Sequence, residues 1–63
     1  MNLLLLHTSN AHLPSREIWV NPIQIRKLCQ EKIDGRETTI VELVGGDSIM
    51  VVELPQKIAE EIQ

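Results

Sequence analysis

The stretch Ile25–Glu53, IRKLCQEKIDGRETTIVELVGGDSIMVVE, decides the fold. Thr38–Val44 and Ser48–Glu53 are rich in β-branched residues and flank a glycine-containing break, Gly45-Gly46-Asp47. An earlier break, Asp34-Gly35, is among the strongest signals for a two-residue hairpin, because type I′ turns need positive φ at both positions. The stretch therefore predicts antiparallel strands joined by tight hairpins.

The first hairpin has a register that its side chains support. A turn at Asp34-Gly35 places Lys32 opposite Glu37, Gln30 opposite Thr39, Leu28 opposite Val41 and Lys27 opposite Glu42. Two of these cross-strand pairs combine opposite charges, and each such pair contributes roughly 0.2–1 kcal/mol.

Residues 21–33 fit two interpretations. Asn21 as an N-cap, Pro22 at the first helical position and apolar residues at i, i+3, i+4 and i+8 favour a helix. Alternation along the same residues favours a strand, and the following hairpin turn supports it. We predict one helical turn at about residues 21–24 and a strand Ile25–Lys32, with the continuous helix as the alternative.

The second hairpin has two possible registers. A turn at Gly46-Asp47 places Leu43 opposite Met50, Val41 opposite Val52 and Val44 opposite Ile49. A turn at Gly45-Gly46 instead places Leu43 opposite Ser48 and Val44 opposite Asp47. Since register follows the apolar pattern when a face is buried, we predict the Gly46-Asp47 turn.

The flanking segments complete the predicted fold. Leu3–Thr8 is expected to be a strand buried on both faces, Ser9–Glu17 a loop and Ile18–Val20 a strand. Pro55 begins a short helix that docks through Ile58 and Ile62. We predict a single domain over residues 1–63, mainly β (β+α): a small antiparallel β-meander or open barrel with a short C-terminal helix.

Both faces of the predicted sheet are largely aliphatic, although nine helical residues can cover only part of one face. The first face carries Leu28, Val41, Leu43, Met50 and Val52. The N-terminal strands or a second copy of the chain would have to cover the other, so we predict a homo-oligomer. Trp19 is the only aromatic residue, and either an interface or the aliphatic core suits it. The predicted interface residues are Trp19, Ile25, Ile40, Val44, Ile49 and Val51.

The chain lacks the patterns of an enzyme. Cys29 with His7 or His12 is the one conceivable nucleophile–base set, and Cys29 lies in an apolar pattern typical of a core thiol. No metal-ligand spacing or phosphate-binding loop is present. We therefore predict no catalytic residue, no metal and no cofactor.

Charge and hydrophobicity limit the partners and the location. The net charge is -3, from nine acidic and six basic residues, which disfavours binding to nucleic acid. The run Leu3–Leu6 is too short for a signal sequence or a membrane span. With a single cysteine, these features predict a cytoplasmic protein without membrane insertion.

One set of motifs runs through residues 18–62: Ile18-Trp19-Val20-Asn21-Pro22, Ile25, Thr39-Ile40-Val41-Glu42-Leu43 with Gly46, Val51-Val52-Glu53, and Ile58 with Ile62. In these motifs the chain resembles the small FlbD/SwrD-like flagellar proteins. The chain differs in its longer Ser9–Glu17 loop and in Leu54, where the family usually has a serine cap. The resemblance implies a non-enzymatic accessory factor of flagellar function, with no catalytic residues to transfer.

These features together predict a small cytoplasmic protein-interaction module that self-associates and also binds a protein partner. An acidic regulator or inhibitor of a nucleic-acid enzyme, of the kind that phages and plasmids encode, is the alternative. An RNA-binding small barrel is a weaker alternative, because RNA-binding sheets usually display several aromatic residues.

Overall fold

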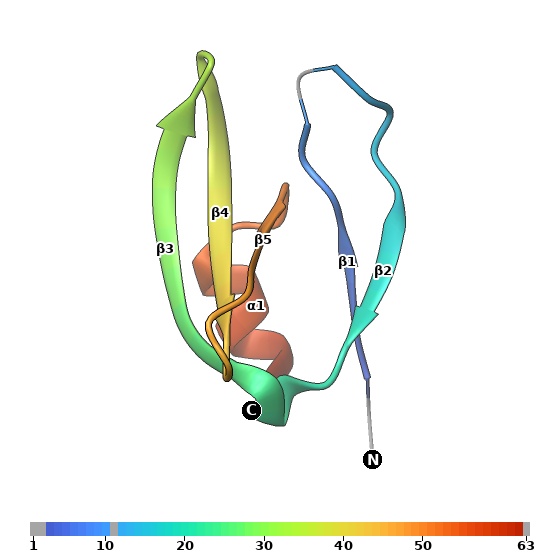
Figure 1. Ribbon diagram of the computed structural model, residues 1–63, viewed down its shortest axis with the longest axis vertical. Coiled ribbons are helices and arrows are strands. Elements are labelled where there is room, and N and C mark those ends of the chain that lie inside the picture. Colours follow the sequence, from blue (N-terminus) through green and yellow to red (C-terminus); the bar gives the residue numbers. More distant parts are fainter. Residues whose placement is uncertain (1–2, 11, 63) are drawn as a thin grey trace.

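The computed structural model describes residues 3–10 and 12–62, and these form mainly strands with one short C-terminal helix. The order along the chain is β1 (Leu4–His7), β2 (Glu17–Val20), a 3-10 turn η1 (Pro22–Gln24), β3 (Ile25–Ile33), β4 (Arg36–Leu43), β5 (Ser48–Val51) and α1 (Pro55–Ile62) (Figure 1). The described strands form two antiparallel sheets, β1-β2 and β3-β4-β5, instead of a closed barrel. The predicted fold class is confirmed.

The β3–β4 hairpin has the predicted turn and register. Asp34 and Gly35 both have positive φ, 50° and 76°, as a type I′ turn requires. Lys32 lies opposite Glu37, and the three further predicted pairs are also observed: Gln30 with Thr39, Leu28 with Val41 and Lys27 with Glu42.

The one-turn helix at residues 21–24 is also observed, and the continuous-helix alternative is wrong. Asn21 is the N-cap of η1: its side-chain Oδ1 accepts a hydrogen bond from the Ile23 N–H at 3.1 Å. Ile25 has extended backbone geometry and starts β3. A helix through residues 21–33 would remove the partner of β4 on one side, so the β3–β4 hairpin overrides the helical periodicity.

The predicted register of the β4–β5 hairpin is wrong. Val41 lies opposite Ile49, three residues before the predicted partner Val52. Gly45 and Gly46 have φ of 104° and 101°, and the Leu43 N–H donates to the Asp47 carbonyl at 2.7 Å, so the loop is longer than the predicted turn. An odd shift exchanges the two faces of β5. Ile49 and Val51 therefore face the core in place of Met50 and Val52.

The β1–β2 hairpin pairs with the end of β5. Thr8 forms an isolated bridge with Val51, and the Val52 N–H donates to the His7 carbonyl at 2.9 Å. Along β1, Leu4 and Leu6 are buried while Leu5 and His7 are only half-buried. The prediction that this strand is buried on both faces is therefore wrong: β1 covers the core with one face and leaves the other partly in solvent.

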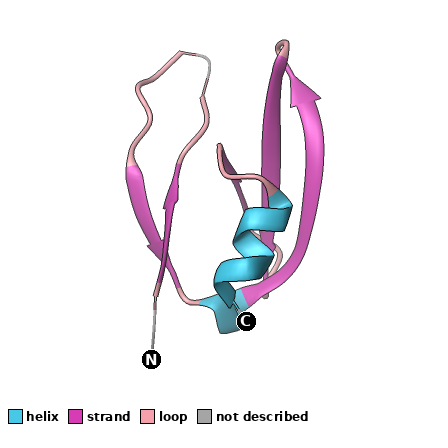
Figure 2. Cartoon of the chain, turned by 180° about the vertical axis from the view of Figure 1, so that it is seen from behind, coloured by secondary structure: helices cyan, strands magenta, loops and turns pink. Residues whose placement is uncertain are grey.

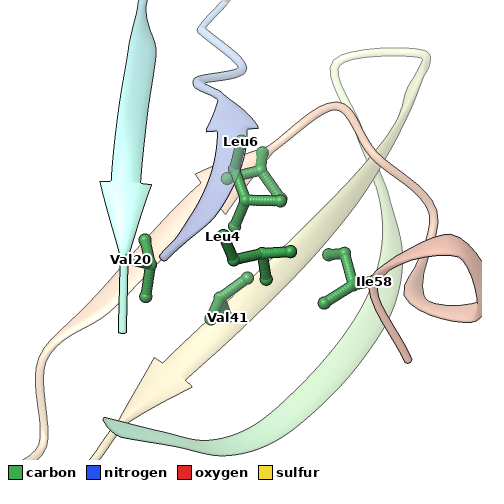
Figure 3. Packing of buried hydrophobic residues seen from close by; sticks show 6 residues of the cluster. Leu4, Leu6, Val20, Val41 and Ile58 are labelled. Carbon is green, nitrogen blue, oxygen red and sulfur yellow. The ribbon is translucent and has the colours of Figure 1, made fainter. Parts of the chain in front are cut away.

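The core lies where the two sheets and the helix meet. Its buried apolar residues are Leu4, Leu6, Val20, Val41, Val51 and Ile58 (Figure 3). Helix α1 lies between the two hairpins (Figure 2) and buries Ile58, whereas Ile62 at its end is 41% exposed. The predicted docking through Ile58 is confirmed, and Ile62 is free to contribute to a surface.

Candidate functional site

The outer face of the β1–β2 hairpin keeps apolar side chains in solvent. Leu4 and Val20 are paired and point into the core. Because side chains alternate along a strand, the next pair, Leu5 and Trp19, points outward. Trp19 is 61% exposed. The strand geometry thus excludes the single tryptophan from the core.

A groove of about 660 Å³ adjoins this face and is bordered by the β1–β2 hairpin, the turn η1 and helix α1. Four of its apolar residues are between 41% and 72% exposed: Leu3, Trp19, Ile23 and Ile62. Contiguous exposed apolar surface marks interaction sites more often than scattered apolar residues do. The groove is therefore the candidate functional site.

The turn η1 sets the position of Ile23 in the groove. Asn21 caps the turn, and the Gln24 N–H donates to the Asn21 carbonyl at 2.9 Å. Pro22 occupies the start of the turn, where its fixed φ suits helical geometry. The turn leaves Ile23 72% exposed, which is the highest exposed fraction of the large apolar residues in the described chain.

The polar residues of the groove include a close pair, His7 and Glu53. The His7 backbone N–H donates to Glu53 Oε1 at 2.9 Å, and the ring Nδ1 lies 2.6 Å from Oε2. Glu17 Oε2 lies 3.9 Å from Nε2 on the other side of the ring. The contacts between His7 and Glu53 connect the end of β1 to the segment between β5 and α1.

The contacts with His7 set the protonation of Glu53. Partial burial by itself raises the pKa of a carboxyl group, because it disfavours the charged form. Hydrogen bonds from the His7 backbone and ring outweigh burial, and the pKa of Glu53 is lowered from its ordinary value of 4.5. Glu53 is therefore an ionised acceptor near neutral pH.

A histidine oriented by a carboxylate can act as a general base toward a nucleophile within reach, and Lys57 carries the one amine side chain among the described lining residues. Among the described residues that line the groove, none has a hydroxyl or thiol group. Cys29 lies on β3 opposite Ile40 and does not line the groove. The contacts of the pair join β1 to the segment before α1, beside an apolar surface.

The six predicted interface residues lie in different environments and do not form one surface. Trp19 lines the groove, and Val44 is 61% exposed in the β4–β5 loop. Ile25 and Ile49 are partly buried and pack against the core, while Ile40 is half-buried on the opposite sheet face. Val51 is fully buried in the core and does not lie on a surface, because the register shift turned it inward.

Sequence reasoning missed the other apolar residues of the groove. The predicted strand Leu3–Thr8 places Leu3 and Leu5 in the interior, and the predicted docking of the C-terminal helix covers Ile62. The alternation within Leu3–His7 was hidden, because four consecutive leucines look alike on both faces of a strand. The helical turn at residues 21–24 was the one available signal that Ile23 would project outward.

The described residues contain no group of three or more His, Cys, Asp or Glu side chains that could hold a metal ion. No helix in the described part of the chain is long and apolar enough to cross a membrane. Comparison of the chain with protein-family models, curated proteins and solved structures found no match.

Proposed function

We propose that this chain is a small non-enzymatic protein-interaction module that binds a protein partner through the groove and associates with its own copies. The observation that carries the proposal is the cluster of Leu3, Trp19, Ile23 and Ile62 around one groove. Tryptophan is among the residues most enriched at the centres of protein interfaces. The groove surrounds Trp19 with aliphatic side chains, which is the composition of an interface core.

The composition of the groove supports a protein segment as its occupant. Small-molecule sites usually combine an apolar lining with a few convergent polar groups. Here the main polar side chains of the groove, His7 and Glu53, contact each other and are not directed at a ligand. Leu3, Trp19 and Ile23 instead offer large apolar side chains to an apolar surface.

The charge of the chain and of the groove indicates the charge of the protein segment that would bind there. The chain carries a net charge of -3, and the groove is lined by Glu53 and Glu61 against Lys57. Complementary charge increases association rates and disfavours wrong partners. The proposed occupant is therefore an apolar segment of another protein, flanked by Lys or Arg residues.

The biological setting follows from the resemblance of residues 18–62 to the FlbD/SwrD-like proteins, and we assign the chain as an accessory factor of the flagellar type acting in the cytoplasm. A regulator of a nucleic-acid enzyme would use the same groove. The identity of the bound protein separates the two: a flagellar motor or export component supports the first role, and a nucleic-acid enzyme supports the second.

Photo-crosslinking in the native host tests the groove. Trp19 and Val44 are each replaced by benzoylphenylalanine, because both side chains are 61% exposed and only Trp19 lines the groove. The expected result is one protein cross-linked from position 19 and not from position 44. A synthetic peptide from the cross-linked region should bind the purified chain, and Trp19→Ala should abolish this binding while the circular dichroism spectrum is retained.

Three results would overturn the groove proposal. The first is equal cross-linking from positions 19 and 44. The second is a cross-link from position 19 solely to another copy of the chain. The third is a peptide that binds the Trp19→Ala variant as tightly as the parent.

A further inference from the structure

The long strand β3 has one open edge. In the described sheet, β3 is a terminal strand and pairs with β4 alone. It spans nine residues, whereas the other terminal strand of this sheet, β5, spans four. An open edge presents unpaired N–H and C=O groups that can add another strand. The open side of β3 can be seen at the outside of the molecule in Figure 1.

The turn geometry determines which residues of β3 direct their backbone groups outward. A type I′ turn at Asp34-Gly35 closes on a hydrogen-bonded pair, here Ile33 and Arg36. Hydrogen-bonded and non-hydrogen-bonded pairs alternate along an antiparallel ladder. Cys29 therefore directs its backbone groups toward Ile40, while those of Leu28 and Gln30 point to the open edge.

We propose that β3 pairs antiparallel with β3 of a second copy, on a two-fold axis at Cys29. This inference rests on the self-association included in the proposed function. In this register Leu28 and Gln30 of one chain exchange backbone hydrogen bonds with Gln30 and Leu28 of the other. Lys27 then lies opposite Glu31 of the second copy, and symmetry forms the same pair twice. The dimer has one continuous six-stranded sheet.

Charge complementarity selects this register over its neighbours. A shift of two positions in one direction places Cys29 opposite Glu31 and Lys27 opposite Ile33. The opposite shift places Cys29 opposite Lys27 and Glu31 opposite Ile25. Neither neighbour pairs opposite charges, and odd shifts put outward backbone groups against inward ones. Of these three registers, the one on Cys29 is the one that places Lys27 opposite Glu31 of the second copy, and it also brings Arg26 close to Lys32.

The remaining charges of β3 are already balanced within each chain. Arg26 lies 3.3 Å from Glu42, measured from Nη1 to Oε1. Lys32 is paired across the hairpin with Glu37. These acidic partners on β4 reduce the repulsion between Arg26 and Lys32 where the two copies bring them close. The sheet face that carries Cys29 also carries Ile40 and Met50 in the same cross-strand row, which the two-fold axis would double.

Cys29 provides a direct test of the register. Residues facing each other on the axis form a non-hydrogen-bonded pair, with Cα atoms about 4.5 Å apart, which is within the range of a disulfide. Treatment of the purified protein with diamide as oxidant is expected to give a disulfide-linked dimer. With Cys29→Ser as background, Lys27→Cys and Glu31→Cys chains should cross-link when mixed and not when each is oxidised alone.

Sedimentation equilibrium with charge variants supplies an independent test. Glu31→Lys places two like-charge pairs at the axis and should raise the dimer dissociation constant by at least about tenfold. Glu31 is a suitable site because it lies opposite the uncharged Thr38 within its own chain. Glu60→Lys changes the net charge equally on the exposed surface of α1 and should leave the dimer intact.

The outcomes separate this inference from the proposed function. A dimer that forms no Cys29 disulfide, or that tolerates Glu31→Lys as well as Glu60→Lys, overturns the β3 pairing and leaves self-association by another surface. A monomer at all concentrations up to the millimolar range overturns both the pairing and the self-association. Binding of a partner at the groove is measured separately by the cross-links from position 19.

Discussion

The Glu53 carboxylate contacts two nitrogen atoms of His7, although the residues are 46 positions apart: Oε1 accepts the backbone N–H at 2.9 Å, and Oε2 lies 2.6 Å from ring Nδ1. The contact joins β1 to the segment that leads into α1. It therefore holds together the N-terminal hairpin and the helix, which border the groove.

Replacing Glu53 with alanine should lower the free energy of unfolding by about 1–3 kcal/mol, because it removes an ionised acceptor and leaves the His7 N–H unpaired. Glu17→Ala is the matched control, since Glu17 is 66% exposed and lies 3.9 Å from the ring, and its effect should stay within about 0.5 kcal/mol. Urea unfolding followed by circular dichroism measures both. Equal effects of the two substitutions would contradict the assigned role of Glu53.

The same pair predicts how stability depends on pH. The pKa of Glu53 is lowered in the folded chain, so below its ordinary value of 4.5 the unfolded chain binds more protons. The stabilisation by Glu53 is fully present above pH 4.5 and is lost as the pH falls through the lowered pKa. The difference in unfolding free energy between the parent and Glu53→Gln should therefore shrink from pH 6 to pH 3. A constant difference over this range would rule out the linkage.

Replacing Thr39 with valine is expected to stabilise the folded chain. The Thr39 Oγ1 is buried and has no hydrogen-bond partner among the described residues, and the residue is 1% exposed. Valine has nearly the same shape and removes the unsatisfied hydroxyl, so the free energy of unfolding should rise by about 1 kcal/mol. Thr38→Val is the control, because the Thr38 hydroxyl donates to the Arg36 carbonyl at 3.3 Å. A loss of stability with Thr39→Val would contradict this account.

Ile58 should dominate the docking of α1. It is 1% exposed, whereas Ile62 on the same helix is 41% exposed. Ile58→Ala should cost about 2–5 kcal/mol and Ile58→Val about 0.5–1.5 kcal/mol. Ile62→Ala should have a smaller effect on stability, and a larger one on partner binding. Thermal unfolding of the three variants distinguishes them, and equal losses for the two alanine variants would refute the assignment.

Short sequence motifs were enough to predict the β3–β4 hairpin, because the conformation of its turn depends on two neighbouring residues. Asp34-Gly35 fixes a two-residue turn by backbone conformation alone, and the register of β3 with β4 follows from it. The register of β5 does not follow, because Ile49-Met50-Val51-Val52 is apolar in either phase. Packing against α1 and against β1, which is distant in sequence, selects Ile49 and Val51 for the core.

The groove was harder to predict, because it too depends on packing between separate segments of the chain. The sequence places Trp19 either at an interface or in the core, and alternation with the buried Val20 resolves the choice once the strand is in place. Ile23 and Ile62 join Trp19 only because the turn and the helix meet beside the N-terminal hairpin. Such a meeting depends on the tertiary arrangement, which no single segment encodes.

Acrylamide quenching of tryptophan fluorescence tests most directly whether the groove is a protein-binding site. Trp19 is the sole tryptophan, and the chain has no tyrosine, so the signal arises at the groove. The probe is the synthetic peptide from the region cross-linked at position 19, with its sequence-scrambled version as the control. We predict that the peptide lowers the quenching constant of Trp19 by at least about twofold while the scrambled version does not, as expected when a 61% exposed side chain becomes an interface core. An unchanged quenching constant at saturating peptide would contradict the account.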